Sequence, residues 1–260
     1  MFFIHAAGDH VVSFKSLARH LGSDQTAYAL EGTQGDGDAE GPSIVDRAER
    51  YLGEIQRVQP DGPYFLGGLS FGGLIALEVA RLLLQRGESV ALLALLDTRA
   101  PGQNWRSISH DLRYYLRQRI EYHLGNLGQL DGRARLEYLG HRLWGMARRT
   151  SKKVTQSMAS AMARVRHPWP RSIRNAYGAA LRAREAYSPT PYPGRITLFR
   201  AQRQPRGITD PYLGWGTLAR GGVEVVGVPG THVSIMSEPR LSALGDALRA
   251  RVLAAQEEGK

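Results

Sequence analysis

A serine that stands between glycines at the junction of a strand and a helix constrains this chain more than any other feature. Residues 65–69 form a short apolar run that predicts a buried parallel strand, and residues 74–84 predict a helix. The pattern between them is G-x-S-x-G, over residues 68–72. A sharp strand-to-helix turn needs these glycines, because a Cβ there would clash with the strand and the helix. The turn would hold the Ser70 hydroxyl above the sheet edge at the positive end of a helix, which favours an activated nucleophile over an ordinary Gly-Ser loop.

The order of the predicted elements indicates the fold class. Strands and helices alternate along most of the chain. Right-handed crossovers turn such an alternation into a mostly parallel sheet with helices on both faces, an α/β architecture. The predicted strands are residues 2–5, 26–30, 65–69, 89–96, 195–200 and 223–228, and the predicted helices are residues 13–21, 44–55, 74–84 and 240–255, with a helix or helical turn near 211–218.

Residues 101–190 interrupt this alternation with helical patterns and no predicted strand. They contain 17 Lys and Arg residues against 5 Asp and Glu, whereas the rest of the chain contains 17 against 19. The net charge of +10 therefore belongs to one segment. A helical insertion just past the sheet edge that carries the nucleophile is typical of a lid. We predict a core of residues 1–100 and 191–260 and a helical lid of residues 101–190.

A serine nucleophile at neutral pH needs a general base, and eight histidines are available. Only His232 directly follows the last predicted strand. Parallel strands deliver their carboxyl ends to one edge of the sheet, so Ser70 and His232 are expected to meet there. We predict His232 as the base. His10 lies near the site by chain order, but a surface role is favoured for it, and the histidines of the insertion are expected to be solvated.

Two aspartates compete for the third position, in which a carboxylate orients the imidazole and stabilises the imidazolium. Asp97 ends the apolar run 89–96, where a carboxylate is costly unless it is paired. Asp210 follows the next-to-last predicted strand, where many hydrolases of this architecture carry their acid. The residues favour Asp97 and leave Asp210 open, and a capping or turn aspartate is the alternative role for Asp97.

The oxyanion of a tetrahedral intermediate needs two preorganised N–H donors. The first is predicted from Phe71, the residue after the nucleophile. The second is predicted from the turn after the first strand, over residues 5–8, where the backbone of Ala7 is our choice. The small residues of that turn would let the backbone approach a substrate.

Composition excludes several other kinds of site. The chain contains no cysteine, so it has no disulfide, no thiolate nucleophile and no cysteine-based metal site. We predict neither a resident cofactor nor a bound metal ion. The N-terminal residues form no secretory signal, and no apolar run approaches the length of a membrane span. These features lead us to expect a cytoplasmic protein without a membrane partner.

The residues that carry these predictions resemble the product-releasing thioesterase domains of non-ribosomal peptide and polyketide synthases. In that family the acid follows the strand after the nucleophile helix, which moves Asp97 ahead of Asp210. Leu69 and Phe71 differ from the His and Met that tend to flank the serine of separate editing thioesterases. The matching pieces span nearly the whole chain in the family's order: residues 3–8, 58–64, 68–73, 95–98 and 228–232.

The resemblance implies an α/β-hydrolase fold with a lid between the sixth and seventh strands. It also implies an acyl, peptidyl or polyketide substrate that arrives as a thioester on the phosphopantetheine arm of a carrier protein. An acyl-Ser70 intermediate would then be resolved by hydrolysis, cyclisation or transfer. Here no carrier domain precedes the first strand and the lid is longer and more basic than a minimal one, so we expect either an excised domain or a free-standing protein.

Two other functions remain as alternatives at this stage. The chain could be a lipase-like serine esterase that acts on free esters. It could also be a non-catalytic module whose basic segment binds nucleic acid. The joint presence of Ser70, Asp97 and His232 argues against the second alternative, and we expect no nucleic-acid partner. Because carrier proteins tend to be acidic, the basic segment is expected to steer their docking.

Overall fold

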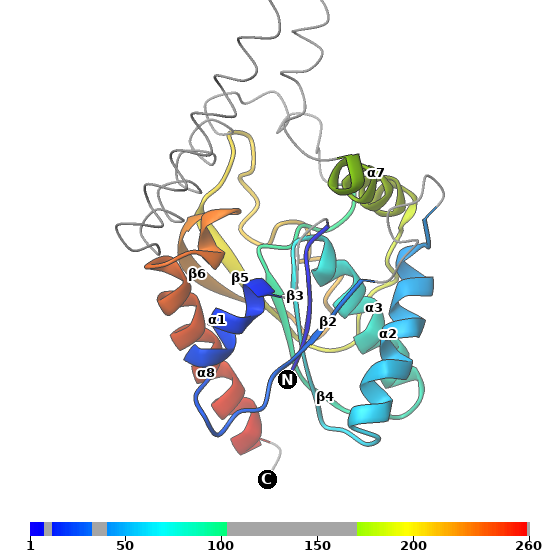
Figure 1. The fold of residues 1–260 in the computed structure, drawn as a ribbon, viewed down its shortest axis with the longest axis vertical. Helices are drawn as coiled ribbons and strands as arrows, with labels where there is room; N and C mark the ends of the chain where they lie inside the picture. The colour runs from blue at the N-terminus through cyan, green and yellow to red at the C-terminus, as the bar shows by residue number, and fades with distance from the viewer. Residues whose placement is uncertain (8–11, 33–40, 103–170, 259–260) are drawn as a thin grey trace, which may run out of the picture.

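A single parallel sheet of six strands forms the centre of the structure (Figure 1). The computed structural model describes residues 1–7, 12–32, 41–102 and 171–258. The strand order is β2-β1-β3-β4-β5-β6, and each neighbouring pair is parallel. The strands are β1 Phe2–Ile4, β2 Tyr28–Leu30, β3 Tyr64–Leu69, β4 Val90–Leu96, β5 Ile196–Arg203 and β6 Val223–Thr231.

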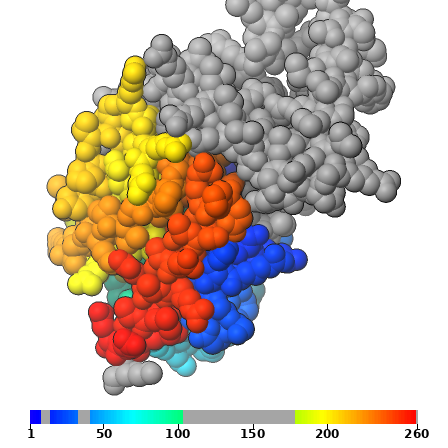
Figure 2. Space-filling model, turned by 90° about the vertical axis from the view of Figure 1, so that its left-hand side faces the viewer, coloured from blue at the N-terminus to red at the C-terminus, as the bar shows by residue number. Residues whose placement is uncertain are grey.

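Helices cover both faces of this sheet, which confirms the predicted α/β architecture (Figure 1). α1 (Val12–His20) and α8 (Arg240–Glu258) lie on one face, and α2 (Ile44–Val58) and α3 (Phe71–Gln85) lie on the other. Figure 2 shows the N-terminal and C-terminal segments side by side on the surface, and α1 packs on α8. The two ends of the chain therefore close the same layer.

Strand β4 is almost entirely apolar because its side chains are buried on both faces of the sheet. Successive side chains of a strand point to opposite faces. Leu93 and Leu95 belong to the core under α2 and α3, whereas Leu92, Ala94 and Leu96 belong to the core under α1 and α8. Because both faces are covered, β4 has no polar side, and the strand delivers the next residue directly to the buried sheet edge.

Ser43 is the capping residue at the start of α2. Ser43 Oγ accepts a hydrogen bond from the Asp46 amide at 3.2 Å, and Asp46 Oδ2 accepts one from the Ser43 amide at 2.9 Å. This reciprocal pair satisfies backbone donors that the first helical turn leaves open. The Ser43 hydroxyl also donates to the Asp46 carboxylate. These hydrogen bonds from Ser43 outweigh the small effect of burial and lower the pKa of Asp46.

Two predicted boundaries differ from the structure for reasons of pairing. β5 continues to Arg203 and β6 to Thr231, because Ala201 pairs with Val228 and Arg203 with Thr231 beyond the end of each apolar run. The segment predicted as a helix or helical turn near 211–218 consists of turns. In it the Trp215 amide donates to the Tyr212 carbonyl at 3.0 Å.

The predicted lid falls mostly outside the described residues, because residues 103–170 are not among them. The described part is α7 (Arg171–Ala186), which leads into β5. Among the described strands, the segment joins β4 to β5. The position between a sixth and a seventh strand, which the family resemblance implies, stays an expectation. The division into core and lid stays a prediction.

The exit from α7 is fastened to α3 by a buried carboxylate. Tyr187 Oη donates to Glu78 Oε2 at 2.8 Å, and Arg81 Nε donates to Glu78 Oε1 at 3.0 Å. Burial, followed by the nearby charge of Glu78, raises the pKa of Tyr187. The neutral phenol therefore remains a donor, and it bonds the carboxylate oxygen of Glu78 that Arg81 does not contact.

Among the described residues, no helix has the length and apolar character that a membrane crossing would require.

Candidate active site

Ser70 occupies a strained turn between β3 and α3. Its φ is 53°, in the left-handed region that non-glycine residues rarely adopt. A Cβ on Gly68 would overlap the Gly72 carbonyl, and a Cβ on Gly72 would overlap the carbonyl oxygens of Ile4 and His5. Both glycines of the G-x-S-x-G pattern are therefore required by close backbone approach. The Ser70 amide donates to the Leu96 carbonyl at 3.0 Å, which fixes the turn to the end of β4.

A third glycine fixes the turn to the loop after β4. A Cβ on Gly73 would overlap the side chain of Thr98, and Thr98 Oγ1 donates to the Gly68 carbonyl at 3.4 Å. Sequence reasoning gave Gly73 no separate role. The signal was present in the doubled glycine that follows Ser70, which a G-x-S-x-G turn alone does not require.

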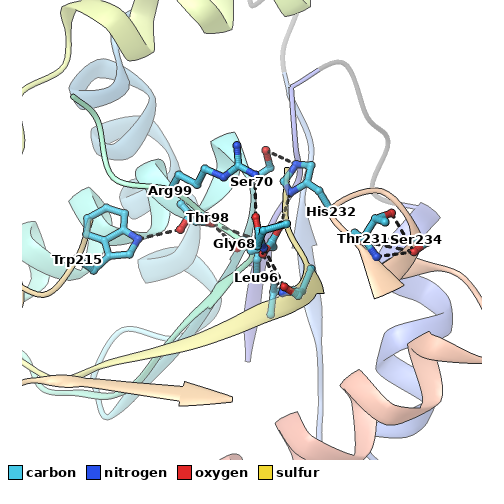
Figure 3. Close-up of polar contacts among 12 residues, drawn as sticks. Gly68, Ser70, Leu96, Thr98, Arg99, Trp215, Thr231, His232 and Ser234 are labelled. Atoms are coloured by element: carbon cyan, nitrogen blue, oxygen red, sulfur yellow. Dashed lines mark hydrogen bonds and ion pairs between the residues drawn. The ribbon is translucent and has the colours of Figure 1, made fainter. Parts of the chain in front are cut away.

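His232 lies between Ser70 and Asp97, and Figure 3 shows its ring beside the Ser70 hydroxyl. Its Nε2 is 3.0 Å from Ser70 Oγ, and its Nδ1 is 2.7 Å from Asp97 Oδ2. Because an ionised carboxylate only accepts hydrogen bonds, Nδ1 carries the proton and donates to Asp97. Nε2 is then the acceptor that faces the serine hydroxyl. The His232 side chain is 30% exposed whereas that of Asp97 is fully buried, so the site opens on the histidine and serine side.

The loop that carries His232 is clamped by its neighbours (Figure 3). Ser234 begins the short 3₁₀ helix η2 (Ser234–Met236), and its Oγ accepts a hydrogen bond from the Thr231 amide at 2.8 Å. Gly230 has a φ of 106°, and a Cβ there would approach Ser234 Oγ to 2.7 Å. The sequence indicated His232 but not this hydrogen bond, which joins the residue before the histidine to the second residue after it.

Asp97 is buried and accepts three hydrogen bonds from residues that the structure describes. Its Oδ2 accepts from His232, and its Oδ1 accepts from the Ala201 amide at 2.8 Å and from Gln204 Nε2 at 2.7 Å. Burial by itself would raise the pKa of Asp97. The hydrogen bond and charge of His232, the Ala201 amide and the positive charge of Arg99 outweigh it and hold that pKa below its usual value. The carboxyl is therefore ionised at neutral pH in spite of its burial.

Asp210, the competing aspartate, does not reach the histidine. Its Oδ1 accepts from the Tyr212 amide at 2.9 Å, and its Oδ2 accepts from the Gly214 amide at 2.6 Å. Both oxygens therefore organise the turn that begins after β5. Of the two aspartates that the sequence offered, the structure brings Asp97 to His232.

The loop that contains Asp210 also supports the residues after β4. Trp215 is fully buried, and its Nε1 donates to the Thr98 carbonyl at 2.8 Å (Figure 3). The Ala100 amide donates to the Leu213 carbonyl at 2.9 Å. Sequence reasoning missed Trp215 and Gln204, because neither residue belongs to a local motif.

The predicted oxyanion donors lie on the two expected sides of the serine turn. Phe71 is the first residue of α3, and the approach of Gly72 to the carbonyls of Ile4 and His5 places the turn after β1 against the start of α3. Ala7 belongs to that turn. Among the described residues, neither the Phe71 amide nor the Ala7 amide has a hydrogen-bond acceptor outside its own element. Their roles stay predictions.

Several other predicted residues fall elsewhere. His10 and the histidines of the insertion lie outside the described residues. His20, on α1, bonds through Nε2 to Glu238 Oε1 at 3.1 Å, away from the serine turn. Within the ranges that the structure describes, no three His, Asp or Glu side chains gather as a metal site would need.

Comparison with known proteins identifies relatives over most of the chain. A family model described as "Thioesterase domain" matches residues 1–251. Chondramide synthase from Chondromyces crocatus is 42% identical over 106 residues, which cover 40% of this chain and 3% of that protein. Malpibaldin synthetase from Mortierella alpina is 26% identical over 264 residues, which cover 97% of this chain and 4% of that protein. The chain therefore spans only a small part of the length of these curated relatives.

A solved structure shares the fold. The NocB thioesterase domain, in covalent complex with a fluorophosphonate nocardicin G analogue, matches with a TM-score of 0.64 and 24% identity. The match covers 96% of this chain and 93% of that domain. At 24% identity, this match shows that the two proteins share a fold, that is, the same arrangement of the sheet and its helices.

Proposed function

The chain belongs to the thioesterase domain family, and on that premise we propose that it releases an acyl, peptidyl or polyketide chain from a phosphopantetheine-bearing carrier protein. One observation carries the proposal. The His232 ring lies 3.0 Å from Ser70 Oγ and 2.7 Å from Asp97 Oδ2, which is the relay that a serine nucleophile needs. The family supplies the thioester chemistry, and this relay supplies the groups that would perform it.

The first step is acylation of Ser70. His232 Nε2 accepts the hydroxyl proton while Ser70 Oγ attacks the thioester carbonyl. Asp97 keeps the Nδ1 proton on the opposite side of the ring and stabilises the imidazolium that forms. The strained turn aids this step, because the backbone at φ 53° projects the hydroxyl away from the sheet and toward His232.

The tetrahedral intermediate carries a negative oxygen that we assign to the amides of Phe71 and Ala7. The Phe71 amide is at the start of α3, where the helix dipole also favours a negative charge. When the intermediate collapses, His232 returns its proton to the departing pantetheine sulfur. The products of this step are a free pantetheine thiol on the carrier and an ester on Ser70.

The second step resolves the ester. Water, activated by His232, gives a free acid; an amine or hydroxyl of the acyl chain gives a ring; and an external nucleophile gives transfer. Each route reuses the same base and the same oxyanion donors. No resident cofactor enters the cycle, because the phosphopantetheine arm arrives with the carrier-bound substrate.

We also propose that residues 101–190 form a lid that contacts the carrier. The support comes from composition: this segment has a charge balance of +12 in a chain of net +10, and carrier proteins tend to be acidic. The association rate of a carrier protein should then fall as salt is raised. Reversing the charges of Arg148 and Arg149 should slow turnover of a carrier-bound thioester and spare a small soluble thioester. A rate that is independent of salt would contradict this role.

Intact-protein mass spectrometry tests the proposed chemistry most directly. Incubation with an acyl-pantetheine should add one acyl group to the wild-type protein and none to Ser70→Ala. Turnover by Ser70→Ala should fall on the order of 10⁴–10⁶-fold. An acyl adduct that persists in Ser70→Ala would disprove the nucleophile. Higher turnover of a simple aryl ester than of a carrier-bound thioester would favour a lipase-like esterase instead.

A further inference from the structure

The carboxamide of Gln204 fills the remaining side of the Asp97 carboxylate. Gln204 Nε2 donates to Asp97 Oδ1 at 2.7 Å and to the Ala201 carbonyl at 2.9 Å. The Ala201 amide donates to the same Asp97 oxygen at 2.8 Å. The three groups form a closed ring around Asp97 Oδ1, while Asp97 Oδ2 faces His232. A rotation of the carboxylate would break two hydrogen bonds of this ring.

Arg99 determines which way the Gln204 amide points. Its Nη2 donates to Gln204 Oε1 at 2.8 Å, and Arg99 is only 8% exposed. A guanidinium only donates, and both Asp97 Oδ1 and the Ala201 carbonyl only accept. One orientation of the amide therefore satisfies all three partners: its oxygen faces Arg99 and its NH₂ group faces Asp97.

The guanidinium is a buried cation whose positive charge acts on Asp97. In the view of Figure 3, the Arg99 side chain runs in the direction of Ser70. Among the residues that the structure describes, Arg99 Nε has no hydrogen-bond partner and the guanidinium forms no direct ion pair with Asp97. Burying a charge without a carboxylate partner is costly, so packing alone does not explain an arginine at this position.

We propose that Gln204 and Arg99 are positioning residues that orient the Asp97 carboxylate toward His232 and limit the negative charge that it presents to the imidazole. This inference rests on the proposed function of Ser70, Asp97 and His232. Gln204 does so by donating to Asp97 Oδ1, and Arg99 does so by orienting the amide and by its own positive charge. Neither residue needs to touch the substrate.

The charged groups that face Asp97 determine in which direction the pH dependence of kcat/KM should change. They are His232 from the loop after β6 and Arg99 from the loop after β4, and Gln204 and the Ala201 amide face it from the end of β5. When the Gln204 donor is removed, the carboxylate carries more of its charge toward His232 and holds the imidazolium proton more tightly. The fall of kcat/KM on the acid side should therefore move to higher pH.

Gln204→Met tests the proposal, since it keeps the length of the side chain and removes both of its polar atoms. We expect kcat to fall about tenfold with KM within about twofold, because a charge-assisted hydrogen bond is lost away from the substrate. The acid limb of kcat/KM should rise by about half a pH unit. Arg99→Met should move the limb in the same direction, and Arg99→Lys should recover part of the change because it keeps the charge.

Gln202→Met is the matched control. Gln202 is exposed and lies on β5, two residues before Gln204, so the same chemical change there should leave kcat and the acid limb unaltered. If Gln204→Met does not fold, Gln204→Glu replaces it. That variant can pair with Arg99 but offers Asp97 no donor at neutral pH, so the acid limb should rise further. An unshifted acid limb in both Gln204 variants would overturn the proposal.

A second measurement separates this inference from the proposed function. The low-field proton resonance of His232 Nδ1–H reports its hydrogen bond to Asp97 without any turnover. It should shift in Gln204→Met and stay in place in Gln202→Met. If the wild-type protein never acquires an acyl group, the proposed function fails while the resonance still tests the positioning. If acylation proceeds and the resonance does not move, the positioning role is wrong and the proposed function stands.

Discussion

The loops that follow β4 and β5 each offer one aspartate at the same edge of the sheet, and they use it in opposite ways. Asp97, after β4, is 1% exposed and accepts hydrogen bonds from His232, Ala201 and Gln204. Asp210, after β5, accepts two amides of its own turn, from Tyr212 and Gly214. The first carboxylate is tied to residues distant in the sequence, and the second only to its neighbours.

The loops after β4 and β5 act together on the Asp97 carboxylate. The loop after β5 does not supply the acid, but it supplies Gln204 to the carboxylate of Asp97 and Trp215 to the carbonyl of Thr98. Asp210 shapes the turn from which Trp215 reaches inward. The loop after β4 thus carries the Asp97 carboxylate, and the loop after β5 holds that carboxylate in place. Substitutions in the two loops should therefore have different effects on turnover and on stability.

The largest expected effect is on turnover, from Asp97→Asn. An amide in place of the carboxylate no longer selects the histidine tautomer with a proton on Nδ1, so kcat should fall by on the order of 10⁴-fold. Steady-state kinetics with a pantetheine thioester measure the change. Asp210→Asn is the matched control, and its kcat should stay within about twofold of wild type, because Asp210 contacts no reacting group. Equal losses in the two variants would refute the division of tasks.

The next effect is on stability, from Trp215→Ala. Removal of a fully buried indole leaves a cavity and an unpaired Thr98 carbonyl, and should lower the free energy of unfolding by about 3–5 kcal/mol. Urea denaturation measures it. Tyr212→Ala, in the same loop, removes a side chain that is 42% exposed and should cost about 0.5 kcal/mol or less. A similar cost for both would mean that the loop is not anchored through Trp215.

Acid stability should report the lowered pKa of the buried Asp97 carboxyl. The folded-state pKa of Asp97 is lowered, so its contribution to stability is complete above the unfolded-chain value of about 3.9 and is lost as the pH falls through the folded value. Unfolding free energies measured between neutral pH and pH 3 should therefore fall less steeply in Asp97→Asn than in wild type. A wild-type slope in Asp97→Asn would contradict the lowered pKa.

The smallest effect is expected from Asp210→Ala. Two amides, of Tyr212 and Gly214, lose their acceptor in a partly solvated turn, and the free energy of unfolding should fall by about 1 kcal/mol. Thermal or urea denaturation measures it, with turnover of the folded protein unchanged. A loss of turnover larger than the loss of folded protein would show that the turn acts on the site itself.

The sequence by itself determined the parts of this protein that depend on local physics. The glycines around Ser70 predict a sharp turn because any Cβ would overlap a neighbouring backbone, and the structure contains those close approaches at Gly68 and Gly72. The unbroken apolar run of β4 predicts a strand covered on both faces, which the two cores confirm. Ser43 predicts the start of α2, and in the structure it forms a reciprocal cap with Asp46. Each of these signals acts within a few residues.

Only the tertiary structure decided which partners meet across the sheet edge. β5 extends to Arg203, past its apolar run, because its backbone pairs with β6. That extension puts the Ala201 amide beside Asp97 and leaves Gln204 at the strand end, within reach of both Asp97 and Arg99. Asp97 and Asp210 each follow a predicted strand, so the local sequence makes both candidates for the acid. Strand register and loop packing decide that Asp97 is the one that contacts His232. Hydrogen bonds between residues about one hundred positions apart depend on how far a strand runs, which no local pattern specifies.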